Sequence, residues 1–325
     1  MRYFVTGATG FLGGELSKQL IGRGDQVVAL VRSPQKASLL KTLGAELHAG
    51  DITRRDSLRP PMAGVDGVFH AAAWYKIGVR NPAAPEINIE GTRNVLETAR
   101  DLKIPRVVYV STIGVFGDTR GEIVDESYYS RGPFITEYDR TKWIAHYEVA
   151  VPIMRAGLPL IIAMPGLVYG PGDTSGVHAA LVQLLRGRLI ATPKRCAFSW
   201  GYIEDVARGL RQAMEAGRPG ESYLLAGPAH TFAEAMTLAA KIAGKRPPRI
   251  HAPAAVMRML AWIVSALERI NIRGPYAAEM LRLMAGTTWL GSSAKAQREL
   301  GFTARPLEEG LGHTVEHELR QLGMA

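Results

Sequence analysis

Two side chains near the middle of the chain have the types and the spacing needed to move a proton. Tyr138 and Lys142 are four residues apart, so on a helix they share one face. Free tyrosine has a pKa of about 10, and a neighbouring ammonium group lowers it by favouring the phenolate. The phenol can then protonate a carbonyl oxygen as hydride arrives, or take a proton from an alcohol as hydride leaves. Alone, the pair is a weak signal, because a helix with a lysine lying along its apolar surface has the same spacing.

A hydroxyl that can hold the same oxygen precedes this pair in the sequence. The apolar, β-branched run 106–112 is typical of a buried strand, and it ends in Ser111 and Thr112. A polar stretch follows, and then Thr136, which has the type preferred at a helix N-cap. We therefore expect a strand that ends in hydroxyls and, after it, a helix that begins near Thr136 and carries Tyr138 and its lysine.

The stretch 6–13 predicts a dinucleotide site. It follows a short apolar run, 2–5, and opens a segment with helical apolar spacing. Gly7 allows a tight turn, Gly10 lets a pyrophosphate approach the backbone, and Gly13 lets the helix pack close to the strand. The helix start adds unpaired N–H groups and the positive end of the helix dipole. Strand, glycine turn and helix in this order favour nucleotide binding over a turn that binds nothing.

The end of the second predicted strand, 26–31, discriminates between NAD and NADP. NAD sites usually have Asp or Glu there, about 20 residues past the glycines, to bind the ribose 2′-hydroxyl. This chain has Arg32, with Lys36 close behind. A guanidinium cannot accept a hydrogen bond, but it can donate two to a 2′-phosphate. We therefore expect NADP rather than NAD, the alternative being that Arg32 is an ordinary surface arginine.

Other residues follow predicted strands at the edge where open parallel sheets bind ligands. Asp51 is placed to reach the adenine or, equally, to cap the next short helix. The fourth predicted strand, 67–73, ends in small residues that leave room for a ligand, whereas its His70 is more typical of a core side chain. Asn88, near the start of a predicted helix, is expected to order the catalytic turn through backbone bonds or to act as a local cap.

Length and composition describe one large α/β protein or two modest lobes. The chain has 325 residues, of which 47% are hydrophobic and 21% are charged, so it can bury a sizeable core. Its one cysteine, Cys196, excludes an internal disulfide and fits a reducing, cytoplasmic compartment. We expect no signal peptide and no membrane-spanning helix. The formal charge is +9, but the basic residues are scattered along the sequence, so we expect no nucleic-acid surface.

The predicted elements change character after residue 173. A sixth strand is predicted over 158–164 and a turn-rich loop over 165–173. Beyond it, strand-like pieces are short and helices dominate. These are strands near 199–204 and 221–226, and helices around 177–187, 205–216, 232–243, 253–270 and 306–322.

Together these segments resemble the extended short-chain dehydrogenase/reductase superfamily, within the NAD-dependent epimerase/dehydratase group. The resemblance covers nearly the whole chain, and its motifs occur in the family's order. They are TGATGFLG at 6–13, GDI at 50–52, HAAA at 70–73, NIEGT at 88–92, VSTIGVFG at 110–117, YDRTK at 138–142 and PGLVYGPGD at 165–173. The resemblance implies a Rossmann-like, doubly wound parallel α/β sheet over 1–173, with a smaller, mostly helical substrate lobe over 174–325 that is interleaved with the last elements of the sheet.

The resemblance also implies a set of site residues. Thr112, Tyr138 and Lys142 take the catalytic roles, with the lysine lowering the pKa of the tyrosine and binding the nicotinamide ribose. The implied cofactor-binding residues, besides this tyrosine and lysine, are Gly7, Thr9, Gly10, Phe11, Leu12, Gly13, Arg32, Lys36, Asp51, Ile52, Ala71, Ala72, Ala73, Asn88, Ser111, Pro165, Gly166 and Val168. No metal is expected, since the H-x-x-E-H spacing at 313–317 is more simply a solvated helix face.

Two features point to a subgroup. VRSPQK at 31–36 looks like the NADP-type segment of dihydroflavonol-reductase-like and 3β-hydroxysteroid-dehydrogenase-like members. Nucleotide-sugar epimerases commonly carry an asparagine after the sixth strand, where this chain has Met164-Pro165-Gly166. We therefore expect an NADP-dependent oxidoreductase that transfers hydride between nicotinamide and a carbonyl or secondary alcohol of a fairly hydrophobic small molecule.

Several alternatives stay open. One is a sugar or nucleotide-sugar epimerase or dehydratase that retains its NAD(P), and another is an NADP-binding sensor without activity. The strongly apolar segment 253–270 is expected to be a substrate lid, core or a dimer face, ahead of contact with a membrane surface. We expect a homodimer.

Overall fold

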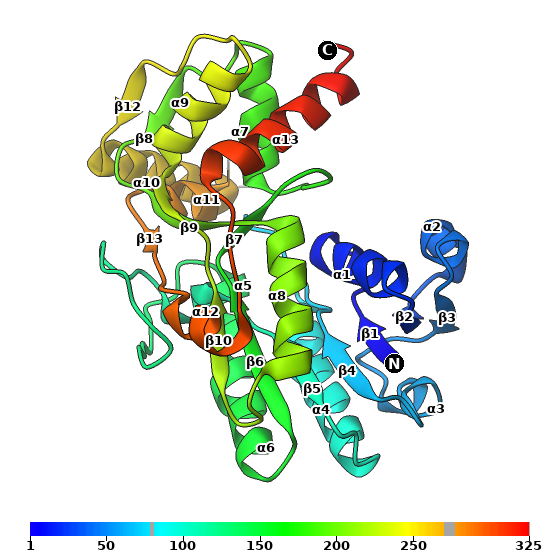
Figure 1. Ribbon diagram of the computed structural model, residues 1–325. Helices are drawn as coiled ribbons and strands as arrows, with labels where there is room; N and C mark the ends of the chain where they lie inside the picture. The colour runs from blue at the N-terminus through cyan, green and yellow to red at the C-terminus, as the bar shows by residue number, and fades with distance from the viewer. Residues whose placement is uncertain (79–80, 270–276, 325) are drawn as a thin grey trace.

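Seven strands form one parallel sheet with helices on both faces, and most of them are apolar runs of the sequence (Figure 1). The computed structural model describes residues 1–78, 81–269 and 277–324. The strands of this sheet are β1 (Arg2–Thr6), β2 (Gln26–Val31), β3 (Glu46–Ala49), β4 (Gly67–His70), β5 (Val107–Val110), β6 (Leu160–Pro165) and β10 (Ser222–Leu225). Their order is β10-β6-β5-β4-β1-β2-β3, so it reverses between β1 and β4. This is the predicted doubly wound, Rossmann-like arrangement, which binds ligands where the strand order reverses.

In the central strands, alternate side chains are buried on opposite faces of the sheet. From β1, Val5 packs with α1 (Phe11–Gly22) and α8 (Ile203–Ala216), whereas Phe4 packs on the other face with α4 (Gly91–Asp101). The second face is continued by α5 (Glu137–Ile144), α6 (Val151–Arg155) and the π-helical stretches η3 (Glu86–Glu90) and η5 (Ala145–Ala150). Short elements in the connections are η1 (Pro34–Ala37), α2 (Ser38–Thr42), η2 (Arg55–Ser57), α3 (Arg59–Met62) and η4 (Ile113–Phe116).

The second half of the chain adds helices and two small sheets. β9 (Ala197–Tyr202) pairs with β7 (Leu167–Tyr169), β11 (Ala229–Thr231) and β13 (Thr288–Trp289), and β8 (Ala191–Pro193) pairs with β12 (Ile250–Ala252). The helices are α7 (Gly176–Leu185), α9 (Phe232–Ile242), α10 (Ala254–Arg269), α11 (Ala278–Leu283), α12 (Ala294–Leu300) and α13 (Leu307–Gln321). Because β10 lies beside β6 in the main sheet, this half of the chain returns to complete it.

The predicted loop over 165–173 is wrong in its centre. Leu167–Tyr169 forms β7, which pairs in parallel with β9. This strand could not be recognised in the sequence, because turn residues flank it and three residues are too few to show the alternation of apolar and polar side chains. The predicted helix over 253–270 is observed as α10, whose final predicted position, 270, lies outside the described residues.

Two kinds of feature are absent from the residues that the structure describes. In that part of the chain no helix has both the length and the apolar character needed to span a bilayer. Nor does it bring together three or more His, Cys, Asp or Glu side chains in an arrangement suited to a metal ion.

Candidate active site

The glycine turn after β1 is built so that backbone packs against backbone. Gly7 has φ +74°, and a Cβ there would lie 2.7 Å from the Ala72 amide nitrogen of the strand end beside it. A Cβ on Gly13 would overlap the Gly7 carbonyl oxygen. Gly10 is the N-cap of α1 and has no side chain to cover the free N–H groups of the first turn. The three glycines thus leave an open cradle at a helix N-terminus, which suits a pyrophosphate.

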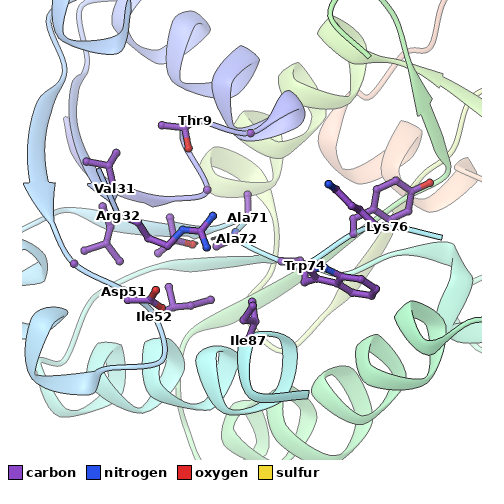
Figure 2. A pocket seen from close by; sticks show the side chains of 17 residues that line it. Thr9, Val31, Arg32, Asp51, Ile52, Ala71, Ala72, Trp74, Lys76 and Ile87 are labelled. Atoms are coloured by element: carbon purple, nitrogen blue, oxygen red, sulfur yellow. Dashed lines mark hydrogen bonds between the residues drawn. The ribbon is translucent and has the colours of Figure 1, made fainter. Parts of the chain in front are cut away.

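A cavity of about 330 Å³ opens beside this turn, at the point where the strand order reverses (Figure 2). Nine of the predicted cofactor residues line it, namely Gly7, Thr9, Gly10, Arg32, Asp51, Ile52, Ala71, Ala72 and Ala73. The volume exceeds what a few waters need, and the lining joins the ends of β1, β2, β3 and β4. The structure therefore brings the N-terminal part of the predicted set together around one space.

Arg32 follows β2 and is exposed, and Figure 2 shows its side chain directed into this cavity. Asp51 lines the cavity from the end of the neighbouring strand β3, and its Oδ1 accepts hydrogen bonds from the Thr53 amide at 2.9 Å and hydroxyl at 3.0 Å. It therefore caps a turn rather than the next helix, whose N-cap is Arg54. Lys36, on η1, is exposed and is not part of the cavity lining.

The tyrosine of the predicted catalytic set lies on the first turn of α5. Thr136 is the N-cap of that helix and accepts from the Asp139 amide, as predicted. Thr112 caps η4 by accepting from the Gly114 amide at 3.1 Å, and its hydroxyl lies near enough to the Tyr138 phenol to lower the pKa of that group. Burial raises the pKa of Tyr138 well above its ordinary value, and the Thr112 hydroxyl opposes this only in part. The structure thus brings the strand-end hydroxyl next to the phenol.

Lys142 lies one turn further along α5 and is almost fully buried. Its Nζ donates to the Tyr109 hydroxyl at 2.9 Å and to the Val110 carbonyl at 2.8 Å. Desolvation lowers the pKa of this amine to about 7. From the sequence we expect this lysine to lower the pKa of Tyr138; in the structure its hydrogen bonds go to β5, because the long side chain reaches acceptors there that compensate its burial.

Behind the lysine, His70 bridges two strands and a helix inside the protein. Its Nδ1 bonds the Thr6 hydroxyl at 2.8 Å and its Nε2 bonds the Thr92 hydroxyl at 3.0 Å. Burial, with the charge of Lys142, lowers its pKa to about 3, so the ring is neutral near pH 7. His70 is therefore a satisfied core side chain, as predicted.

Two other predicted residues face the interior rather than the cavity. The Ser111 hydroxyl bonds His146 Nδ1 at 2.8 Å and is buried. Asn88, in η3, accepts from the Trp74 amide at 2.7 Å and donates to the Trp74 carbonyl at 3.1 Å and to the Thr141 hydroxyl at 2.9 Å. Asn88 thus fixes the backbone after β4 against the helix that carries Tyr138.

The segment that Asn88 anchors was not predicted as part of the site. Trp74, Tyr75 and Lys76 line the cavity, and Figure 2 shows Trp74 and Lys76 at its side away from Asp51. The Tyr75 ring meets the Tyr138 ring edge to face, with centroids 4.8 Å apart. Only the aromatic residues directly after the small-residue run at 71–73 hinted at this wall in the sequence.

The remaining predicted residues lie on neighbouring elements. Phe11 and Leu12 start α1 and are half-buried, and Pro165 ends β6. A Cβ on Gly166 would overlap the Ser199 carbonyl oxygen, so glycine is required there by the approach of β9. Val168 lies within β7. The close approach of β9 therefore explains the glycine at position 166 without any bound ligand.

The family model for the "NAD dependent epimerase/dehydratase family" matches residues 3–226. The chain belongs to this family. It is an NAD(P)-dependent oxidoreductase of the extended short-chain dehydrogenase/reductase type, and the glycine cradle and cavity fit the nicotinamide dinucleotide that this family uses.

Relatives of this epimerase/dehydratase-family chain include several reductases. The sequence is 32% identical to 4-hydroxy-2-methyl-3-oxo-4-farnesyl-3,4-dihydroquinoline-1-oxide ketoreductase of Stigmatella aurantiaca, over 100% of this chain and 97% of that protein. It is 31% identical to sterol demethylase protein B of Methylococcus capsulatus, over 93% of both chains. Among solved structures, gox2253 superposes with a TM-score of 0.85 at 29% identity, covering 99% of this chain and 98% of that one.

Proposed function

We propose that this enzyme is an NADPH-dependent ketoreductase that reduces a carbonyl group of a fairly hydrophobic small molecule, or runs the reverse oxidation. The observation that carries the proposal is the position of Tyr138, which lies beside the Thr112 hydroxyl and contacts the ring of Tyr75 in the cavity lining, with centroids 4.8 Å apart. A carbonyl oxygen placed between the Thr112 and Tyr138 hydroxyls receives two hydrogen bonds as it gains negative charge.

In the proposed reaction, different residues of the chain donate the proton and position the substrate oxygen. Bound NADPH supplies the hydride. Tyr138 donates its phenolic proton to the substrate oxygen, and Thr112 holds that oxygen in place. We propose that Lys142, on the same helix face, lowers the pKa of Tyr138 and binds the nicotinamide ribose in the loaded enzyme. Because the pKa of its buried amine is near 7, the charged and neutral forms of Lys142 differ little in free energy at neutral pH.

The preference for NADP rests on Arg32. Its guanidinium enters the cavity from the end of β2, where NAD sites usually have an acidic residue (Figure 2). A 2′-phosphate there would accept charge-assisted hydrogen bonds from it. Lys36, on the next turn of chain, adds positive charge to the same side.

A hydrophobic substrate is favoured by two kinds of observation. Tyr75 and Trp74 form an aromatic wall at the catalytic end of the cavity. The names of two relatives describe a farnesyl-bearing ketone and a sterol-processing protein, at 32% and 31% identity. We propose for this chain the shared chemistry, a carbonyl on an apolar framework, and not either substrate.

The experiment is a steady-state measurement of NADPH oxidation with a panel of apolar and polar ketones. Turnover of apolar ketones that the Tyr138→Phe variant lacks would support the proposal. Turnover that is unaffected in that variant would rule out the mechanism.

The family description favours a second candidate, an epimerase or dehydratase with retained cofactor. Such an enzyme converts its substrate with no net change in nicotinamide absorbance, and it purifies with NAD(P) bound. We rank this candidate second because the segment Met164-Pro165-Gly166 lacks the asparagine that would bind a sugar diphosphate. The homodimer and the cytoplasmic location are also predictions, to be tested by light scattering and by cell fractionation.

A further inference from the structure

Helix α10 presents an apolar face to solvent instead of to the protein. Val256, Met259, Leu260, Ile263 and Leu267 are spaced as one stripe of a helix, and all five are exposed. Of the helix residues, only Ala261 is buried. The expectation that this segment is core is therefore wrong.

Trp262 is the most exposed large hydrophobic side chain of this helix, at 75%. It lies next to the stripe, which together with Trp262 we call the apolar face of α10. Ile250 of β12 and Ile190, directly before β8, are also exposed, by 54% and 69%. So many exposed apolar side chains on one helix and its neighbouring strands are uncommon on a protein that stays alone in water.

The net charge of the protein is concentrated beside this face. Segments 186–195 and 241–269 contain ten of the 39 Lys and Arg residues but only one of the 30 acidic residues, Glu268. The remaining chain has 29 of each sign, so these two segments account for the whole charge of +9.

Pairing of β8 with β12 brings these two segments together, although they are far apart in the sequence (Figure 1). The Lys194 amide donates to the Ala252 carbonyl, directly before α10. Arg246, Arg249 and Arg258 are exposed. The basic residues that look scattered in the sequence are therefore gathered at one end of the molecule.

We infer that this end of the protein docks on the surface of an anionic lipid bilayer, with the apolar face of α10 at the boundary of headgroups and acyl chains. A helix with exposed aliphatic residues and tryptophan, surrounded by Lys and Arg, matches both parts of such a surface. A second copy of the chain fits less well, because each copy would bring its nine excess positive charges to the contact. Nucleic acid would match the charge but not the apolar stripe.

The docking surface is connected to the candidate active site. Glu268 of α10 accepts from the Ala278 amide at the start of α11. The next residue, Glu279, accepts from the Gly78 amide at 2.5 Å and from the Glu137 amide at 2.8 Å, directly before Tyr138. If the proposed function holds, this connection would link docking on a bilayer to the segments that carry Tyr75 and Tyr138, where an apolar ketone is reduced.

The test is co-sedimentation of the full-length protein with vesicles of phosphatidylcholine alone and of phosphatidylcholine mixed with phosphatidylglycerol. We expect binding to the mixed vesicles, weak binding to the neutral ones, and a loss of binding as salt is added. The triple variant Met259→Ser, Trp262→Ser, Ile263→Ser and the double variant Arg246→Glu, Arg249→Glu should each bind at least about tenfold more weakly.

A matched control makes the same charge change elsewhere. Arg54→Glu with Arg59→Glu alters two exposed arginines near α3 and should leave most of the binding intact. Unchanged unfolding and turnover of a water-soluble ketone would show that the variants are folded. Tryptophan emission that shifts to the blue on mixed vesicles, and does so less in Trp262→Phe, would report insertion of the helix itself.

Absence of binding to mixed vesicles would overturn the inference, as would an equal loss in the control pair. A dimer that the triple variant dissociates, without vesicle binding, would identify a second copy as the occupant, and tighter binding to duplex DNA would identify nucleic acid. Vesicle binding needs no turnover. A protein that binds vesicles but reduces no ketone would therefore contradict the proposed function alone.

Discussion

The Tyr75 ring contacts Tyr138 edge to face, with ring planes at 81° to each other. Tyr75 also lines the cavity and is 42% exposed, so it connects the cavity lining to Tyr138. Under the proposed function, a substrate that reaches Tyr138 from this cavity packs against the Tyr75 ring. The pair would then separate two roles, proton donation by Tyr138 and substrate contact by Tyr75.

Tyr138→Phe should lower turnover by roughly 10²–10⁴-fold, because it removes the proton donor and keeps the ring. NADPH binding should remain. Tyr75→Phe is the matched control, since it also loses one hydroxyl and keeps the edge-to-face contact, and it should retain turnover within a few-fold. NADPH oxidation measures both. Equal losses in the two variants would contradict the assignment of Tyr138.

Arg32→Asp should raise the KM for NADPH by at least about tenfold, because it replaces charge-assisted hydrogen bonds to a phosphate with repulsion. The KM for NADH should change much less or fall. Lys36→Asp, with the same charge change outside the cavity lining, should have the smaller effect. Kinetics with both cofactors provide the measurement, and equal effects on both would remove the reason for choosing NADP.

Gly13→Ala should destroy the cofactor cradle, because the added Cβ would overlap the Gly7 carbonyl oxygen. We expect a loss of about 1–3 kcal/mol in the free energy of unfolding and at least tenfold weaker NADPH binding. Gly14→Ala is the control one residue away, where the new Cβ would be 3.4 Å from the Ala8 carbonyl oxygen. In a helix interior that change should be neutral or stabilise by up to about 1 kcal/mol. Urea unfolding and NADPH titration would show whether the two differ.

Asn88→Ala should destabilise the protein by about 1–3 kcal/mol, because it leaves the partly buried Trp74 backbone groups without their partners. It should also raise the KM for the substrate, since the segment 74–76 loses its anchor. Asn94→Ala removes only the bond to the Ile52 carbonyl and should cost less. A KM that stays unchanged in a destabilised Asn88 variant would restrict Asn88 to a structural role.

Asp139 makes stability depend on pH in an unusual direction. Burial raises its pKa from the ordinary 3.8 to about 7, and Oδ1 has no hydrogen-bond partner among the described residues. The folded protein thus retains a proton that the unfolded chain releases, so this carboxyl costs stability as the pH rises from about 4 to about 7. Asp139→Asn should match the parent near pH 4 and exceed it by up to a few kcal/mol above pH 7.

The control for this prediction is Asp125→Asn. Hydrogen bonds from Ser127 lower the pKa of Asp125, so its stabilising effect is present above the ordinary pKa and lost in acid. The Asp125→Asn variant should therefore be slightly less stable than the parent at neutral pH, and this difference in the free energy of unfolding should disappear as the pH falls. Chemical unfolding across the pH range measures both variants. A parent and an Asp139 variant with parallel pH profiles would show that the carboxyl is ionised in the folded state.

Features with a local signal were predictable from the sequence. The strand, glycine turn and helix at the N-terminus, the Thr136 cap and the arginine after β2 all depend on neighbours within one or two turns. The main sheet followed from apolar runs of four to six residues. These strands are long enough to be recognised before their partners are known.

Features that depend on distant segments were not predictable. β7 is a strand only because β9 lies beside it, and Lys142 donates to Tyr109 because the end of β5 approaches α5. The sequence could not show that α10 is exposed, because a helix with an apolar stripe has the same sequence pattern whether the stripe is buried or faces solvent. The clustering of basic residues could not be predicted either, because it arises only when β8 pairs with β12.

The last strand of the main sheet has a consequence for synthesis of the protein. β10 covers the edge of β6, but it is translated only after the whole stretch from β7 to α8. While that stretch leaves the ribosome, β6 presents an open edge of unpaired backbone groups, which is a template for aggregation. We expect nascent chains arrested before residue 222 to recruit chaperones, and those that extend beyond β10 to be released from them.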